Sequence, residues 1–216
     1  MMPWVAMAGL AYLAGSIPFG LWLTWWIAGV DLRSVGSGNI GATNATRVLG
    51  GKWGSVVLLL DALKGLLPTL MLPMLFDGSE PLIHHERVLA GVCAILGHSY
   101  PIWLGFRGGK GVATSLGAVL ILSPWGTLVA AGLFAAAFAL TRIVSAGSLL
   151  AAVGFAVFQW FALQPDPWSA ANWSLTAFSL GVPLLIIVRH RNNIVRLLRG
   201  EERGLQGGQD AAPEKP

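Results

Sequence analysis

Long apolar runs recur through almost the whole chain, and they restrict the folds that it can adopt. Hydrophobic residues make up 55% of the chain and charged residues only 11%, and the mean hydropathy is +0.66. A soluble core with a polar surface does not fit that balance. We therefore predict an all-α integral membrane protein with about seven transmembrane helices. The seven stretches cover approximately residues 4–29, 53–76, 88–104, 112–122, 125–140, 144–163 and 173–188.

The fourth of these stretches is short for a membrane crossing. Its about eleven residues reach roughly 17 Å at ~1.5 Å per residue, whereas the hydrocarbon core is ~30 Å thick. It must therefore tilt, extend or re-enter. Ser123 and Pro124 predict a break before the fifth stretch, because proline lacks a backbone N–H and crowds the preceding turn. We expect one membrane domain over residues 1–203 and a disordered polar tail over residues 204–216.

The distribution of basic residues predicts the orientation in the membrane. With the N-terminus outside and the C-terminus cytoplasmic, the inner loops and tail receive Arg33, Arg47, Lys52, Arg107, Lys110, Arg142, Arg189, Arg191, Arg196, Arg199 and Arg203. The outer face receives Asp77, Glu80, Glu86, Arg87 and Asp166. Such a one-sided bias is typical of membrane proteins, so the net charge of +4 does not indicate nucleic-acid binding. The lone Cys93 can form neither an internal disulfide nor a multi-cysteine metal site.

A first polar cluster separates the first and second apolar stretches, at residues 36–47 (GSGNIGATNATR). Its glycines let backbone N–H groups approach an anion, and Arg47 can bind a phosphate group in bidentate fashion. The cluster also matches the dinucleotide fingerprint G-x-G-x-x-G, but that site needs a preceding strand, whereas membrane helices flank this one. The alternative to an anion site is a polar turn with helix-capping residues.

A second cluster, residues 105–115 (GFRGGKGVATS), leads into the fourth stretch. It is not a nucleotide-binding P-loop, because Leu104 and Gly111 occupy positions where that motif needs glycine and a hydroxyl residue. A glycine-rich turn, Lys110 and a helix N-terminus still favour an anion cradle. Basic residues at the inner face would explain the charges of this cluster but not its glycines.

The third cluster, residues 189–202, follows the last stretch. Ile194, Leu197 and Leu198 share one side of a predicted helix and arginines the other, as in a surface helix on anionic lipid. His190 and Asn193 are three positions apart, so we expect them to face the same way.

Asp61, Lys64 and His98 stand out among the polar residues within the apolar stretches. Asp61 and Lys64 are spaced i, i+3 at a depth where an unpaired charge is costly, so we expect an ion pair that either braces the bundle or touches substrate. His98 precedes Pro101 at the inner end of the third stretch. It could serve catalysis or a hydrogen bond between helices.

The three clusters together, SGNIGATNATR, GHSYPIWLGFRGGKGVATS and RHRNNIVRLLRGEE, resemble the bacterial acyl-phosphate:glycerol-3-phosphate acyltransferases, the PlsY family. The resemblance extends to Glu202 and includes D-x-x-K-G at residues 61–65. It implies a seven-helix enzyme of the bacterial inner membrane with a cytoplasmic site. Such an enzyme moves an acyl group from acyl phosphate to the 1-hydroxyl of glycerol 3-phosphate, giving lysophosphatidic acid and phosphate, the first step of phospholipid synthesis. Membrane lipid and the soluble enzyme that makes acyl phosphate are the further partners it implies, with no cofactor, metal or nucleic acid.

The matching positions supply candidate site residues. The catalytic candidates are Ser37, Arg47, Lys110, His190 and Asn193. The substrate-binding candidates are Gly36, Gly38, Asn39, Gly41, Thr43, Asn44, Lys64, His98, Gly108, Gly109, Gly111, Thr114 and Ser115.

The expected chemistry needs no nucleophilic side chain. An acyl phosphate carries its own leaving group, and the sequence contains no nucleophile elbow or Cys-His pair. Positioning and electrostatics would then supply the rate enhancement, with a substrate phosphate oxygen favoured over His190 or His98 as the base. The acyltransferase class with an H-x-x-x-x-D pair is excluded, because no histidine is followed by aspartate at that spacing. An anion or phosphate transporter is the alternative function, but it predicts a polar transmembrane path and an inverted repeat, and the sequence shows neither.

Overall fold

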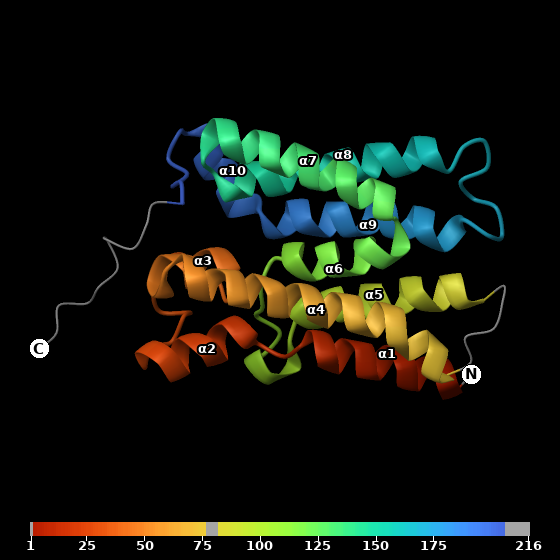
Figure 1. Ribbon diagram of the computed structural model, residues 1–216, viewed down its shortest axis with the longest axis horizontal. Coiled ribbons are helices and arrows are strands. Elements are labelled where there is room, and N and C mark those ends of the chain that lie inside the picture. The colour runs from red at the N-terminus through yellow and green to blue at the C-terminus, as the bar shows by residue number, and fades with distance from the viewer. Residues whose placement is uncertain (1, 77–81, 206–216) are drawn as a thin grey trace, which may run out of the picture.

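Long helices run alongside one another along a common axis and form a bundle (Figure 1). The computed structural model describes residues 2–76 and 82–205, so the predicted outer-face residues Asp77 and Glu80 and the tail from residue 206 lie outside the described part. The elements are α1 Met2–Gly15, α2 Phe19–Ala28, α3 Ala42–Leu49, α4 Gly51–Phe76, α5 Ile83–Ser99, the short 3₁₀ helix η1 Ile102–Leu104, α6 Val112–Leu122, α7 Pro124–Thr141, α8 Val144–Ala162, α9 Trp173–Arg189 and α10 Arg191–Leu198.

All seven predicted stretches are helical. The fourth stretch is α6, with the bounds predicted for it, and the predicted break before α7 is present. Ser123 caps α7, because its side chain accepts a hydrogen bond of 3.2 Å from the N–H of Gly126. Among the described residues, five helical stretches are long and apolar enough to cross a membrane, and α9 with α10, bent by 63°, would make a sixth. A count of seven crossings stays a prediction, as does the orientation of the termini.

The first apolar stretch is broken, which the sequence analysis did not predict. Residues 16–18 separate α1 from α2, because Pro18 has no N–H to donate and disfavours helical geometry at Ile17. The carbonyl of Ile17 accepts a hydrogen bond of 2.7 Å from the Lys64 ammonium on α4. Lys64 also pairs with Asp61 at 2.8 Å, as the sequence predicts, and both side chains are almost completely buried. Lys64, held by Asp61, therefore connects α4 to the segment between α1 and α2.

The main core lies where α5, α6, α8 and α9 meet, with Ile95, Ala118, Phe155 and Phe178 buried in it. On its other side α6 packs closely on α4. A side chain at Gly117 would overlap the carbonyl of Ala62, so the two backbones are nearly in contact there. Close packing on both sides holds the N-terminal end of the short α6 inside the bundle, while Leu116 and Leu120 on its remaining face are exposed.

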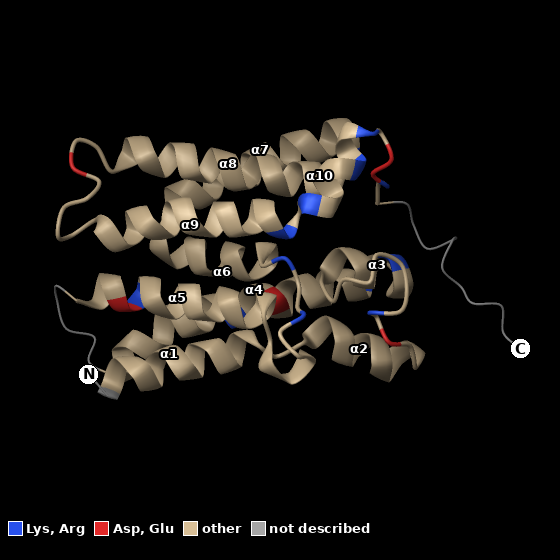
Figure 2. Cartoon of the chain, turned by 180° about the vertical axis from the view of Figure 1, so that it is seen from behind, with Lys and Arg blue, Asp and Glu red and all other residues tan. Residues whose placement is uncertain are grey.

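Lysine and arginine gather at the end of the bundle that carries α3 and α10 (Figure 2). Helix α5 carries an arginine, Arg87, towards the other end, next to Glu86 in the sequence. The loop before α3 and the segment around α10 lie at this end, and the loop before α6 lies further into the bundle on the same side of its middle (Figure 1). Segments far apart in sequence thus meet at one end of the bundle, as the charge pattern predicts.

Candidate active site

A cavity of about 710 Å³ opens among α3, the first half of α4, the loop before α6, the facing ends of α7 and α8, and the segment from His190 onward. All three polar clusters contribute to its lining. The candidate residues from the sequence that line it are Gly36, Ser37, Asn39, Gly41, Thr43, Asn44, Arg47, His98, Lys110, Gly111, His190 and Asn193.

Six candidate residues do not line this cavity. Gly38 and Gly108 line a separate recess, described below. Lys64 is bound to Asp61 and the carbonyl of Ile17, as described above. The other three lie behind the cavity wall: Gly109, whose backbone packs on the His98 ring, and the buried hydroxyl residues Thr114 and Ser115 at the start of α6.

Asn44 organises the loop before α3. It is 1% exposed, and its Oδ1 accepts a hydrogen bond of 2.9 Å from the N–H of Ser37. Its Nδ2 donates to the carbonyls of Leu32 and Val35, at 3.0 Å each. Gly36 has φ +58°, and a side chain there would overlap Asn44 Oδ1, so glycine is required. Asn44 thereby fixes the loop, and Ser37 is held at the exposed rim of the cavity.

Arg47 and the C-terminal segment meet across the cavity rim. Arg47 Nη2 donates to the carbonyl of Arg203 at 3.3 Å. The segment continues to Leu205, whose N–H donates to the carbonyl of Arg142 at 3.1 Å, so the chain is held against the cavity two residues past the predicted boundary at residue 203. Burial lowers the pKa of the Arg47 guanidinium from its ordinary value, and the nearby Glu202 carboxylate opposes that effect.

A chain of hydrogen bonds crosses the polar end of the cavity. Lys110 Nζ donates to Asn193 Oδ1 at 2.6 Å, and Asn193 Nδ2 donates to Glu202 Oε1. Glu202 also accepts from Arg196 Nε at 2.6 Å and from Ser145 at 2.8 Å. Burial alone would raise the pKa of the Glu202 carboxyl, but these three hydrogen bonds together outweigh it and lower that pKa. Glu202 is therefore ionised and anchors the chain.

The same end of the cavity holds excess positive charge. Burial lowers the pKa of Lys110 to about 8; Glu202 opposes this shift, and Arg196, Arg47 and Arg189 add to it. A lysine surrounded by arginines is poised for an anion, because a bound phosphate group would restore its ordinary pKa. The electrostatics therefore fit a phosphate-bearing ligand.

His190 is neutral. It is 2% exposed, and its Nδ1 donates to the carbonyl of Ile186 at 2.8 Å, because a carbonyl can only accept. Burial, with Lys110 adding to it, lowers the pKa of His190 to about 4. Nε2 therefore carries a free lone pair beside Lys110. His98 lies deeper, with its Nδ1 3.8 Å from Asp61 Oδ1, and both residues line the cavity floor.

Part of the cavity wall is apolar. Leu58, Phe134, Phe138 and Val144 line it, and the two phenylalanine rings stack with their centroids 5.9 Å apart. The cavity thus combines a cationic end with an apolar wall, which fits a molecule that carries both a phosphate group and a hydrocarbon chain.

Several residues of the cavity carry no signal of a site in the sequence. Glu202 and Arg196 were part of the third cluster, but only their place in a basic, partly amphipathic tail was visible. Ser145, Phe134 and Phe138 lie in apolar stretches that carry no local signal of a site. These residues reach the cavity only because the facing ends of α7 and α8 lie beside the C-terminal segment, where Ser145 bonds Glu202.

Comparison with known proteins identifies what the chain is similar to. A family model described as Glycerol-3-phosphate acyltransferase matches residues 5–200. A glycerol-3-phosphate acyltransferase of Myxococcus xanthus (strain DK1622) is 49% identical over 198 residues, covering 92% of this chain and 97% of that protein. The corresponding protein of Anaeromyxobacter sp. (strain Fw109-5) is 48% identical over 203 residues, covering 94% and 96%.

Two solved structures of PlsY, an integral membrane glycerol 3-phosphate acyltransferase, are similar over 93% of this chain and 94% of theirs. The glycerol 3-phosphate form has a TM-score of 0.81 and is 39% identical to this chain. The lysophosphatidic acid form has a TM-score of 0.78 and is 36% identical. The resemblance found in the three polar clusters is thereby confirmed.

Proposed function

Because this chain belongs to the integral membrane glycerol-3-phosphate acyltransferase family, we propose that it transfers a fatty acyl group from acyl phosphate to the 1-hydroxyl of glycerol 3-phosphate. The products are lysophosphatidic acid and inorganic phosphate. The observation that carries the proposal is the cluster of Arg47, Lys110 and Arg196 in a cavity that also has an apolar wall.

Both substrates bear a phosphate group, and the cavity has cationic groups for two phosphate groups. Ser37 and Arg47 come from the loop before α3 and from α3, whereas Lys110, His190 and Asn193 come from the loop before α6 and the segment around α10. Arg47 binds one phosphate group and Lys110 the other, and each cation gains more from an anion than it would in water because the site is partly desolvated. The bridge from Lys110 through Asn193 to Glu202 holds the ammonium in place before substrate arrives.

The reaction needs one substitution at the acyl carbon. The 1-hydroxyl oxygen of glycerol 3-phosphate attacks the carbonyl carbon of the donor, and a new ester bond forms. The bond between that carbon and the phosphate oxygen breaks, and phosphate leaves with the bonding electrons. Positioning of the two substrates supplies much of the rate, and the cations stabilise charge that develops on the leaving group.

The hydroxyl proton goes to a phosphate oxygen of the substrate. His190 is a weak base because its pKa is lowered to about 4, so its role is to accept a hydrogen bond through Nε2 and orient the hydroxyl. Among the described residues, none of the serines that line the cavity is hydrogen-bonded to a histidine, so the site contains no activated serine nucleophile. Transfer is therefore direct, without an acyl-enzyme.

The acyl chain lies against Leu58, Phe134 and Phe138 and leaves the cavity between α4 and α7. We place the enzyme in the bacterial inner membrane with this cavity on the cytoplasmic side, where glycerol 3-phosphate and a soluble enzyme that makes acyl phosphate have access to it. The transporter alternative is not supported by any of the comparisons.

The proposal is tested by offering the purified protein alternative acyl donors. With palmitoyl phosphate and glycerol 3-phosphate alone, we expect lysophosphatidic acid and phosphate in equal amounts, without added nucleotide or metal. Palmitoyl thioesters at the same concentration should give no product above the background rate. Product formation from the thioester at a comparable rate would contradict the proposed donor while leaving the family assignment intact.

A further inference from the structure

A second recess lies beside the cavity, with a volume of about 640 Å³. It is lined by Arg33, Gly38 and Ile40 from the loop before α3, by residues 104–108, and by Arg189 at the end of α9. The loop that separates it from the main cavity carries Gly108 in the recess wall and Lys110 in the cavity wall. The recess is therefore distinct from the substrate cavity.

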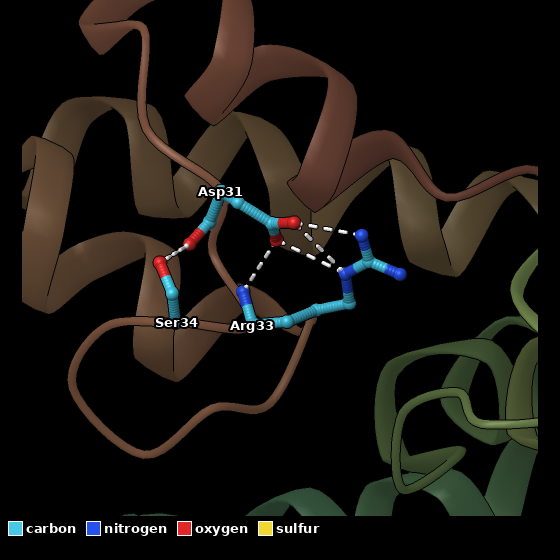
Figure 3. Close-up of polar contacts among 3 residues, drawn as sticks. All are labelled: Asp31, Arg33 and Ser34. Atoms are coloured by element: carbon cyan, nitrogen blue, oxygen red, sulfur yellow. Dashed lines mark hydrogen bonds and ion pairs between the residues drawn. The ribbon is translucent and has the colours of Figure 1, made fainter.

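Positive charge dominates this recess. Its lining contains three arginines and no acidic residue. Arg33 forms a fork with the Asp31 carboxylate through Nε and Nη2, with the shortest contact at 2.7 Å, and its remaining nitrogen points away from that carboxylate (Figure 3). None of the described residues forms a hydrogen bond or an ion pair with Arg107, and Arg189 is bound only to neutral groups. One carboxylate thus neutralises one guanidinium, and two charges stay uncompensated.

Arg189 also builds the wall of the recess. Its Nε and Nη2 donate to the carbonyls of Gly109 and Gly108 at 3.0 and 2.7 Å, and its guanidinium lies over the Tyr100 ring at 5.2 Å. These contacts hold the loop of residues 105–109 in one conformation. The recess is consequently a preformed site whose charge is carried on a rigid support.

An apolar turn borders the recess. Ile102, Trp103 and Phe106 are 48%, 59% and 56% exposed, and the turn projects at the edge of the bundle near the gap between α1 and α2 (Figure 1). Phe106 has φ +62°, a conformation that costs free energy for a bulky residue. An exposed tryptophan and phenylalanine next to arginines are typical of the interface between lipid chains and headgroups.

We propose that this recess binds the phosphate headgroup of an anionic phospholipid of the surrounding bilayer. Arg33 and Arg107 contact the headgroup, and Ile102, Trp103 and Phe106 contact its acyl chains. Charge complementarity favours a phosphate that lacks a compensating ammonium, and the apolar turn favours a lipid over a free phosphate ion or an acidic protein surface.

The test compares lipid retention by native mass spectrometry on purified protein titrated with phosphatidylglycerol or phosphatidylcholine of the same chain length. We expect the wild-type protein to retain one phosphatidylglycerol with an apparent Kd about tenfold lower than the Arg33→Gln/Arg107→Gln variant. The apparent Kd of phosphatidylcholine for the wild type should be at least as high as that of phosphatidylglycerol for the Arg33→Gln/Arg107→Gln variant. The Arg191→Gln/Arg199→Gln variant is the matched control, because both arginines are exposed on α10 or at its end and line neither the recess nor the cavity.

A Phe106→Gly variant separates lipid binding from folding. Glycine tolerates the positive φ, so the melting temperature should be maintained or raised while retention of phosphatidylglycerol falls. Equal retention by wild type and the Arg33→Gln/Arg107→Gln variant would overturn the proposal. Displacement of the lipid by glycerol 3-phosphate would place it in the main cavity instead. If the Arg33→Gln/Arg107→Gln variant retained the lipid but no longer bound an acidic soluble protein, the recess would instead be a protein-docking site.

Discussion

Lys110 and Asn193, 83 positions apart in the sequence, are joined by a hydrogen bond of 2.6 Å across the polar end of the cavity. Lys110 comes from the loop before α6, and Asn193 from the first turn of α10. Asn193 in turn donates to Glu202. Two segments that are far apart in sequence thus share one cation site, which requires the start of α6 and the end of α9 to lie at the same level of the bundle.

Removing either principal cation should nearly abolish transfer. We expect Arg47→Ala and Lys110→Ala each to lower kcat/KM by about 10²–10³-fold, because phosphate charge would be left uncompensated in a partly desolvated site. Melting temperatures should stay close to that of the wild type. Lys52→Ala is the control, because Lys52 is exposed at the start of α4 and does not line the cavity. Near-normal turnover of either cavity variant would contradict the two-phosphate arrangement.

The pKa of Lys110 predicts how activity depends on pH. The ammonium is the form that binds phosphate, and with a pKa of about 8 it is present below that pH and lost above it. At low glycerol 3-phosphate concentration, kcat/KM should therefore fall as the pH rises through about 8. In Lys110→Arg the guanidinium stays charged, so the remaining activity should not show this fall. Initial rates of lysophosphatidic acid formation between pH 6 and about 10 would measure both profiles.

Glu202 supplies a second check on the same group. Its carboxylate raises the pKa of Lys110, so Glu202→Gln should move the alkaline fall of activity to lower pH. Glu201→Gln is the matched control, because Glu201 is an exposed neighbour that is not among the groups shifting the pKa of Lys110. Identical profiles for the two variants would show that Glu202 does not act through Lys110.

The ion pair of Asp61 and Lys64 should behave as a brace. Lys64→Met would leave a buried carboxylate and the carbonyl of Ile17 without the ammonium, and we expect it to cost about 3 kcal/mol of stability. Asp61→Asn/Lys64→Met should be more stable than Lys64→Met, because no lone charge remains, and it should also recover most of the turnover. Melting temperature and initial rate on both variants decide this. If the double variant were stable but slow, Lys64 would instead be a residue that contacts the substrate.

The orientation can be tested by cysteine labelling in a Cys93→Ala background. Ser37→Cys and Arg199→Cys lie at exposed positions of the basic end, and Trp168→Cys lies at an exposed position of the other end. In intact cells a membrane-impermeant thiol reagent should label only Trp168→Cys, and the other two should react after permeabilisation. Labelling of Ser37→Cys or Arg199→Cys in intact cells would contradict a cytoplasmic site.

Much of this arrangement could be predicted from the sequence, for identifiable physical reasons. A continuous apolar run and Pro124 define α6 and the break that follows it, since a proline at a helix start leaves a clear signal. The glycine-rich clusters indicate anion binding, because glycines beside Arg47 or Lys110 let backbone N–H groups approach an anion that the basic side chain also binds.

Other features depend on tertiary contacts and could not be predicted. Pro18 marks the break at Ile17 in the sequence, but hydropathy is high on both sides of it. Only the contact with Lys64 shows how the carbonyl of Ile17 is satisfied. Glu202 sits in a polar tail without periodicity, and its role arises from bonds to Ser145 and Asn193 on other elements. Phe134 looks like any lipid-facing residue until α7 is packed over the cavity.

Direct transfer between two bound phosphate compounds is tested most directly by measuring the release of phosphate from acyl phosphate. Purified Cys93→Ala and wild-type protein should both be active, because Cys93 lies on α5 and does not line the cavity. With acyl phosphate alone, rapid mixing should show no burst of phosphate, and mass spectrometry no acylated protein. Adding glycerol 3-phosphate should release phosphate and lysophosphatidic acid in equal amounts. A burst equal to the enzyme concentration, with acylated protein, would contradict direct transfer.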